Sequence, residues 1–272
     1  MSAKNPVPEF QAELAAAVAA AEAAEQVIAR YYQRSFNVDT KEDNSPVTQA
    51  DVESEEAIRE LLVSRFPDYG FYGEETGSVG VDADYLWLVD PIDGTKSFVR
   101  GSPYFSTQIA LMHHGQIVVG VSNAPAASER AFAALGQGAY LNGERVRSRS
   151  GASLDNAFLS SGNLRSLAAN PVRWSRYGAL LQRVARIRGY GDYCHYHQLA
   201  CGQADIVIES DVNILDIAAL SLLVNEAGGW FTDLDGHPIS LETTSVLAAA
   251  SPELHAIVLA GLQIDSAATV ST

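Results

Sequence analysis

Apolar residues recur at helical spacing in two segments near the start of the chain. The Ala-rich segment from about residue 8 to 32 predicts a long helix. A second helix is predicted for residues 51–66, where Ile58, Leu61, Leu62 and Phe66 share one face. Both helices have one apolar face, which we expect to pack against other elements of the fold.

Other segments follow the pattern of strands. Residues 85–89 are a short apolar run that ends abruptly in Asp-Pro-Ile-Asp-Gly-Thr, which predicts a strand followed by a turn. Residues 105–113 and 116–122 predict a hairpin, and residues 204–209 another strand. Residues 216–227 predict a helix that ends at Gly228 and Gly229. Strands and helices therefore occur in both halves of the chain, as in an α+β protein.

Composition and charge limit the class of partner. The chain has 272 residues, of which 47% are hydrophobic, and can bury a large core. Its formal net charge of −15 disfavours nucleic acid and anionic membranes. No run of 18 apolar residues occurs, and acidic residues interrupt the Ala-rich segment near the start. We therefore expect a soluble, cytoplasmic protein, with Cys194 and Cys201 unpaired.

The negative charge is unevenly distributed. Residues 145–188 hold nine arginines against one acid, Asp155, so this stretch carries +8 and the remainder −23. The pattern fits a solvated or subunit-facing surface, and it also fits a patch that draws in an anionic substrate.

The segment after the predicted strand 85–89 combines oxygen ligands with a turn. Because Pro91 cannot donate a hydrogen bond to a β-ladder, we expect it to end the strand. The turn would then bring together Asp90, the Ile92 carbonyl and Asp93, whose hard oxygens suit Mg²⁺. Two carboxylates this close would repel each other unless a cation neutralised them.

The following residues suggest a phosphate site, and further acids occur elsewhere. Gly94 permits a close backbone approach, and Thr95 and Lys96 would present free amides of the kind that bind phosphate at a helix start. Glu74 lies in the glycine-flanked segment 73–77, just before the strand that leads to Asp90. Asp216 opens the predicted helix 216–227, where it is either a further ligand or an ordinary helix cap.

Four motifs in order resemble one known family. SPVTQADVESE, GEETG, WLVDPIDGTKSFVRG and LDIAALSLLVNEAGG are similar to the signature of the inositol monophosphatase family of Mg²⁺-dependent phosphatases. The resemblance covers nearly the whole chain. It implies a layered αβαβα sandwich of the type shared with fructose-1,6-bisphosphatase, in a homodimer. Residues 1–272 would form a single domain, with most metal ligands in residues 1–150 and Asp216 in residues 151–272.

The resemblance also implies a role for individual residues. It places one Mg²⁺ on Glu74, Asp90 and the Ile92 carbonyl, and a second on Asp90, Asp93 and Asp216. A third ion would bind near Glu74, which gives two or three ions per site. Thr95 and Asp51 match the pair that orients and deprotonates the attacking water, with Glu74 also in the catalytic set. The amides of Gly94 and Thr95 match the phosphate cradle, and Lys41 matches a lysine of the loop in front of the site.

The substrate expectation depends on fewer residues. The segment 190–209 and the form DGTKSFVRG look most like the histidinol-phosphate phosphatase branch, whose substrate is a small phosphorylated metabolite. Asp192 would then bind a cationic amine or imidazole, unless it only caps a helix, and Glu209 matches the position that contacts the non-phosphate part of the substrate. His195 and His197 are expected to pack or lie at the surface. Leu215 stands where the family commonly has an aromatic residue.

Other functions stay open on the sequence alone. Within the family the alternatives are inositol 1-monophosphate, fructose bisphosphate and 3′-phosphoadenosine 5′-phosphate, and some relatives have roles in transcription complexes. Residues 232–236 imitate the DxD motif of haloacid dehalogenase phosphatases. That motif should follow an N-terminal strand, so we interpret this one as a β-turn.

Overall fold

The computed structural model describes residues 9–34, 38–40 and 46–263, which form two compact units. The first unit comprises the described residues up to Val146 together with Leu215–Ala227, and the second comprises Arg147–Ile214 and the residues from Gly228 onward. The boundary lies close to the expected division near residue 150. The segment that carries Asp216, however, belongs to the first unit, although it follows most of the second in sequence.

The first unit contains an eight-stranded sheet of order β10-β9-β8-β7-β6-β5-β3-β4 and a two-stranded sheet, β1-β2. Its elements are α1 (Gln11–Tyr31), β1 (Val38–Thr40), β2 (Pro46–Thr48), α2 (Gln49–Arg65), β3 (Gly70–Gly73), β4 (Ser78–Val79), β5 (Tyr85–Asp93), α3 (Thr95–Val99), β6 (Ser106–His113), β7 (Gln116–Ala124), η1 (Pro125–Ala127), β8 (Glu129–Ala134), β9 (Ala139–Leu141), β10 (Glu144–Val146) and α7 (Ile214–Glu226).

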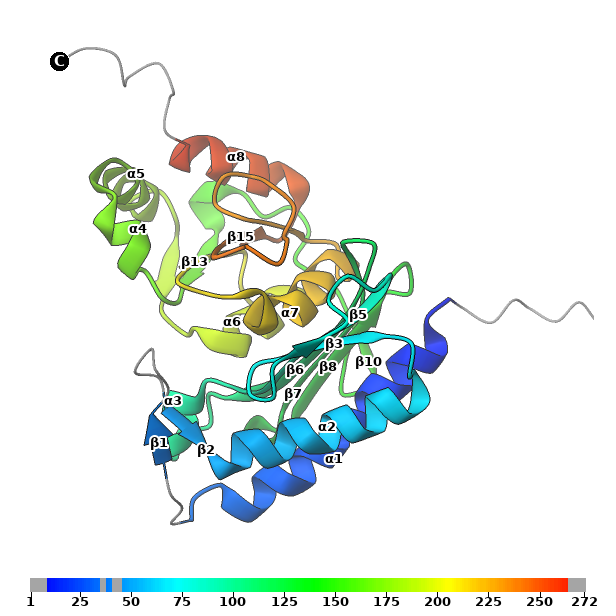
Figure 1. The fold of residues 1–272 in the computed structure, drawn as a ribbon. Coiled ribbons are helices and arrows are strands. Elements are labelled where there is room, and N and C mark those ends of the chain that lie inside the picture. The colour runs from blue at the N-terminus through cyan, green and yellow to red at the C-terminus, as the bar shows by residue number, and fades with distance from the viewer. Residues whose placement is uncertain (1–8, 35–37, 41–45, 264–272) are drawn as a thin grey trace, which may run out of the picture. The chain divides into compact units, whose positions relative to one another are not determined.

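Helices α1 and α2 lie side by side along one face of the eight-stranded sheet (Figure 1). Small side chains let α1 pack closely, because its alanines at positions 16, 17, 20, 21 and 24 are fully buried. The sheet contributes Val89, Ile109, Val119 and Val121 to this core. Because side chains alternate along a strand, the residues between them face the opposite side of the sheet.

Helix α7 packs on that opposite face. A Cβ on Gly120 of β7 would lie 2.6 Å from the carbonyl oxygen of Ala219, so the helix backbone touches the strand. At the far end of α7, the Glu226 carboxylate accepts hydrogen bonds from the amides of Gly136 (2.7 Å) and Gly138 (2.6 Å). The first unit is therefore a sheet with helices on both faces.

The second unit has a five-stranded sheet of order β12-β11-β13-β15-β14. Its elements are η2 (Leu154–Asn156), β11 (Phe158–Ser161), α4 (Arg165–Ala169), α5 (Pro171–Leu181), β12 (Arg186–Arg188), α6 (Asp192–Ala200), β13 (Ile206–Ser210), β14 (Trp230–Thr232), β15 (Ser245–Ala249) and α8 (Pro252–Leu262). Helices α5 and α8 share a core with Leu159, Ile206 and Leu247. On the other face, Tyr196 of α6 packs on Phe231, with ring centroids 5.7 Å apart.

Mixed sheets flanked by helices confirm the predicted α+β class. The predicted helices and the hairpin formed by β6 and β7 are present, with boundaries shifted by a few residues. One local prediction was wrong: Pro91 does not end its strand. Strand β5 continues to Asp93, because a register shift between Asp90 and Asp93 accommodates the proline, and the ladder resumes where Asp93 pairs with Ser106. Residues 233–236 form the expected turn, closed by Gly236 N and the Asp233 carbonyl.

Candidate active site

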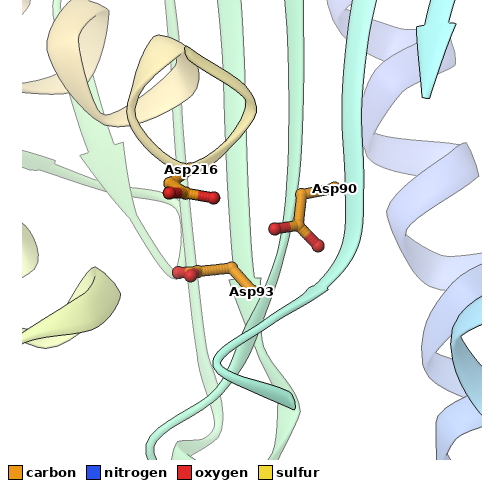
Figure 2. Close-up of side chains that lie close together, drawn as sticks. All are labelled: Asp90, Asp93 and Asp216. Carbon is orange, nitrogen blue, oxygen red and sulfur yellow. The ribbon is translucent and has the colours of Figure 1, made fainter. Parts of the chain in front are cut away.

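Three aspartates meet where the end of β5 faces the first turn of α7. Carboxylate oxygens of Asp90, Asp93 and Asp216 all lie within 4.8 Å of one another. Figure 2 shows the three side chains pointing toward a common point, with Asp216 on the helix and the other two on the strand segment. Asp93 and Asp216 are 123 positions apart in the sequence, so this convergence arises from the packing of α7 on the sheet.

The irregular end of β5 positions its two aspartates. The register shift alters the side-chain alternation between Asp90 and Asp93, so both can face α7. The Ile92 amide donates to Asp90 Oδ1 (2.9 Å), and the Thr107 hydroxyl donates to the Pro91 carbonyl (2.9 Å). Asp90 is 2% exposed, so little water reaches its carboxylate.

The electrostatics of this cluster favour a cation. Burial raises the pKa of Asp90 well above its usual range, and the nearby charges of Glu74, Asp93 and Asp216 raise it further. Glu74 also contacts Asp90 through a side-chain hydrogen bond. Several carboxylates in a buried site are stable as anions only beside a positive charge, and their hard oxygens suit a divalent metal ion. The residues therefore fit the metal that the motifs predict.

Beside the cluster, α2 places Asp51 against Thr95. Thr48 caps the helix, and both its amide (2.8 Å) and its hydroxyl (2.5 Å) donate to Asp51 Oδ2. The Thr95 hydroxyl lies 3.2 Å from Asp51 Oδ1 and 3.0 Å from the Ile92 carbonyl oxygen. Burial raises the pKa of Asp51, and the Thr48 hydrogen bonds oppose that rise. This arrangement joins a carboxylate, a hydroxyl and the β5 turn in one hydrogen-bonded chain.

Gly94 links the aspartate cluster to α3. Its φ of 87° is in the left-handed region, and a Cβ there would lie 2.7 Å from the Tyr104 carbonyl oxygen. Glycine is therefore required both by conformation and by space. The backbone at Gly94 and Thr95 is thus held next to Asp93 without a side chain in the way.

The two expected substrate residues lie in the second unit. Glu209 is only 3% exposed, and each of its carboxylate oxygens accepts hydrogen bonds: Oε1 from the Asn163 amide (3.1 Å), and Oε2 from the Tyr196 hydroxyl (2.8 Å) and His195 Nε2 (3.1 Å). These contacts occupy Glu209 within its own unit. His195 is fully buried, which confirms that it packs in the interior.

Asp192 is different from Glu209. It is half-buried at the start of α6, with a φ of 47°, and Gly191 is the N-cap of the helix. Burial raises the pKa of Asp192 to about 6, the charge of Glu209 raises it too, and His195 opposes the rise. A carboxylate in an environment that disfavours its own charge has an electrostatic reason to bind a cation.

The sequence analysis missed a polar layer behind the aspartates. Gln108 of β6 pairs with Asp90 in register and is 1% exposed. Its amide nitrogen donates to the hydroxyls of Ser106 (2.8 Å) and Ser122 (3.1 Å), and the Ser106 hydroxyl lies 3.5 Å from Asp93 Oδ2. The signal was available, because Ser106, Thr107 and Gln108 are three consecutive polar residues at the start of an otherwise apolar strand.

Glu55 was missed as well. This carboxylate on α2 is fully buried and bonds to the backbone of the loop that carries Glu74. Its place one helical turn after Asp51 was the signal that could have identified it. Lys41, which the motifs assign to the loop in front of the site, lies outside the described residues.

Comparisons with known proteins identify relatives that match most of this chain. The model of the inositol monophosphatase family matches residues 10–266. A histidinol-phosphatase from Mycobacterium tuberculosis is 40% identical over 230 residues, which is 82% of this chain and 88% of that protein. An inositol-1-monophosphatase from Rhizobium meliloti is 36% identical over 217 residues, 79% of this chain and 82% of that protein. The crystal structure of the extragenic suppressor protein suhB from Bartonella henselae superposes with a TM-score of 0.84 at 29% identity, covering 94% of this chain and all of that one.

The chain therefore belongs to the inositol monophosphatase family. It is a phosphatase, a hydrolase of phosphate monoesters, as the four motifs predicted. Among the helices of the described residues, none is long and apolar enough to cross a membrane.

Proposed function

We propose that this protein is a Mg²⁺-dependent phosphatase whose favoured substrate is L-histidinol phosphate, a compound of histidine biosynthesis. The convergence of Asp90, Asp93 and Asp216 supports metal-dependent hydrolysis. The raised pKa of Asp192, a carboxylate whose own charge is disfavoured, supports a substrate that carries a cationic group. We further propose a cytoplasmic homodimer.

The metal ions, two or three per site, would be held by Glu74, Asp90, Asp93, Asp216 and the Ile92 carbonyl. When bound, Mg²⁺ neutralises these carboxylates, polarises the phosphoryl oxygens and lowers the pKa of water. The protein supplies the geometry, because the β5 turn and α7 hold the ligands in place before the substrate arrives.

The hydrogen-bonded chain through Thr95 would remove a proton from the attacking water. The Thr95 hydroxyl accepts this proton while its own passes to Asp51, and the water oxygen displaces the substrate alkoxide from phosphorus. Burial of Asp51 raises its pKa and so makes it a better base. The amides of Gly94 and Thr95 would hold the phosphoryl oxygens in line for this displacement.

Asp192 would recognise the amine or imidazole of the substrate through a charge-assisted hydrogen bond. Glu209 would contribute indirectly, through the effect of its charge on Asp192, because its own oxygens already accept hydrogen bonds from protein groups. Inositol 1-monophosphate is the second candidate, because an inositol-1-monophosphatase from Rhizobium meliloti is 36% identical. The uncharged inositol ring carries no cationic group that could pair with the Asp192 carboxylate.

A turnover comparison tests the proposal. Histidinol phosphate, inositol 1-monophosphate, fructose 1,6-bisphosphate and 3′-phosphoadenosine 5′-phosphate are assayed side by side at fixed Mg²⁺. We expect the highest kcat/KM for histidinol phosphate, and a loss of about a thousandfold or more in Asp90→Asn and Asp216→Asn. A higher kcat/KM for inositol phosphate would contradict the substrate assignment. Absence of turnover on every ester, with capture of a protein partner, would instead favour a binding role.

A further inference from the structure

The carboxylate of Glu55 is buried against the loop that carries Glu74. Its side chain is fully buried on α2, and its two oxygens accept hydrogen bonds from the amides of Glu75 (2.8 Å) and Thr76 (2.6 Å). Space for the carboxylate exists because residue 73 is glycine: a Cβ there would lie 2.3 Å from Glu55 Oε1. Glu55 thus binds the two residues that directly follow Glu74.

This contact fixes the loop on one side, and the sheet fixes it on the other. The Glu74 amide donates to the Val89 carbonyl of β5 (3.2 Å), one residue before Asp90. Glu74 therefore sits between a backbone bond to β5 and the two bonds that Glu55 receives. Burying a carboxylate is costly, and the two charge-assisted bonds from amides offset that cost. A neutral side chain of the same size would not reproduce both bonds.

Helix α2 connects the loop that carries Glu74 to the part of the site formed by Asp51 and Thr95. Asp51, Glu55 and Arg59 follow at steps of four residues and so lie along one face of the helix. Asp51 contacts Thr95, Glu55 binds the loop backbone, and Arg59 donates to the Thr76 hydroxyl (3.1 Å). One rigid helix thus sets the distance between the hydroxyl of Thr95 and the loop that carries Glu74.

We propose that Glu55 is a positioning residue that holds the Glu74 carboxylate where the metal ion binds. The inference rests on the proposed function, because Glu74 is assigned there as a ligand. In Glu55→Gln the side-chain amide would turn an N–H toward one loop amide, so one bond is lost and two donors face each other. The loop would then hold Glu74 less firmly without any change to the ligands.

The test has two measurements on the full chain. Mn²⁺ binding is measured from the electron paramagnetic resonance signal of the free ion, and turnover is measured as a function of Mg²⁺ concentration. We expect Glu55→Gln to weaken Mn²⁺ binding about tenfold and to raise the half-saturating Mg²⁺ by a similar factor. Saturating Mg²⁺ should restore most of kcat, which loss of a chemical group would not allow. Glu56→Gln makes the same charge change at the next, exposed position of α2 and should leave binding within twofold of wild type.

Two further variants separate the possible results. Ile58→Val, in the buried core of α2, should lower the melting temperature without weakening Mn²⁺ binding. If Glu55→Gln behaves in the same way while Glu74→Gln weakens binding, the positioning role is overturned and the proposed function stands. Unchanged binding in Glu74→Gln would instead remove Glu74 from the ligand set, and the inference with it. If Glu55→Gln does not fold, Gly73→Ala decides, because it displaces the intact carboxylate and should weaken Mn²⁺ binding similarly.

Discussion

Asp192 occupies a backbone conformation that few residues adopt readily. Its φ of 47° is in the left-handed region, where asparagine and aspartate are tolerated better than most side chains. The position also raises its pKa to about 6 through burial and the charge of Glu209. An acid whose pKa is higher in the folded than in the unfolded protein costs stability when it is ionised. The cost is present above pH 6 and disappears as the pH falls toward 4.

The variant Asp192→Asn tests this balance, since it keeps both shape and backbone preference. We expect the variant to be about 1–3 kcal/mol more stable than wild type at pH 8, with the difference vanishing near pH 4. Urea unfolding at both values measures the difference. Equal stabilities at pH 8 would contradict the raised pKa.

The same variant separates the candidate substrates. Ionised Asp192 should favour a cationic substrate, so kcat/KM for histidinol phosphate should fall about tenfold or more in Asp192→Asn above pH 6 and converge with wild type below it. Inositol phosphate should be hydrolysed equally by both proteins. Comparing the two proteins on one substrate removes the titration of the substrate's own imidazole from the result. An equal loss on both substrates would contradict the assignment.

The single residues that the sequence could identify are those in contiguous motifs. Asp90, Asp93 and Glu74 stand in segments whose composition indicates their chemistry. Glu55 and Gln108 lie outside these motifs. Their sequence positions mark them only as polar residues on apolar elements, and their roles become visible when folding brings in their partners: the loop after Glu74 and the serines of β6 and β7.

At the scale of elements, the site depends on how closely α7 approaches the sheet. Two contacts hold α7 on the sheet. Ala219, in the first half of the helix, touches Gly120, and Glu226, at its end, accepts hydrogen bonds from the turn at residues 136–138. Asp216 lies one turn before Ala219 on the same helix. Displacement of Ala219 would therefore move Asp216 away from Asp90 and Asp93.

Gly120→Ala should produce such a displacement. Its Cβ would meet the Ala219 carbonyl oxygen at 2.6 Å, so we expect a loss of about 1–3 kcal/mol and weaker Mg²⁺ activation. Gly178→Ala in α5 is the matched control. Open space surrounds that position, and alanine in a helix should stabilise the protein by about 0.5–1 kcal/mol. Differential scanning calorimetry and Mg²⁺ titration of activity measure both effects.

The elements themselves were easier to predict than their contacts. Periodicity indicated α1, α2, the hairpin of β6 and β7, and α7. The continuation of β5 past Pro91 was not predicted, because it depends on a register shift against β6. The approach of α7 to Gly120 joins residues about 100 positions apart, and no local pattern encodes it.

At the scale of the whole molecule, the chain leaves its first unit after Val146 and returns for Leu215–Ala227. The cluster of Asp90, Asp93 and Asp216 is therefore complete only after most of the second unit has been synthesised. A formal charge of −15 adds general repulsion to the local repulsion among the aspartates. Because both kinds of repulsion are reduced by a bound cation, we expect a divalent cation to stabilise the folded protein.

The magnitude and sign of that control can be predicted. A ligand present at about a hundred times its Kd stabilises a protein by about 2.7 kcal/mol, which corresponds to an increase of about 5–10 °C in Tm for a chain of this size. We expect such an increase when Mg²⁺ is added after chelation, and little change with NaCl of equal ionic strength. For Asp216→Asn, we expect the order of the two melting temperatures, variant against wild type, to differ between the two conditions. Without Mg²⁺ the variant should melt above wild type, because one of the repelling charges is gone, and with Mg²⁺ it should melt below it, because a ligand is gone. A variant that melts below wild type in both conditions would show that Asp216 supports the fold and not a cation.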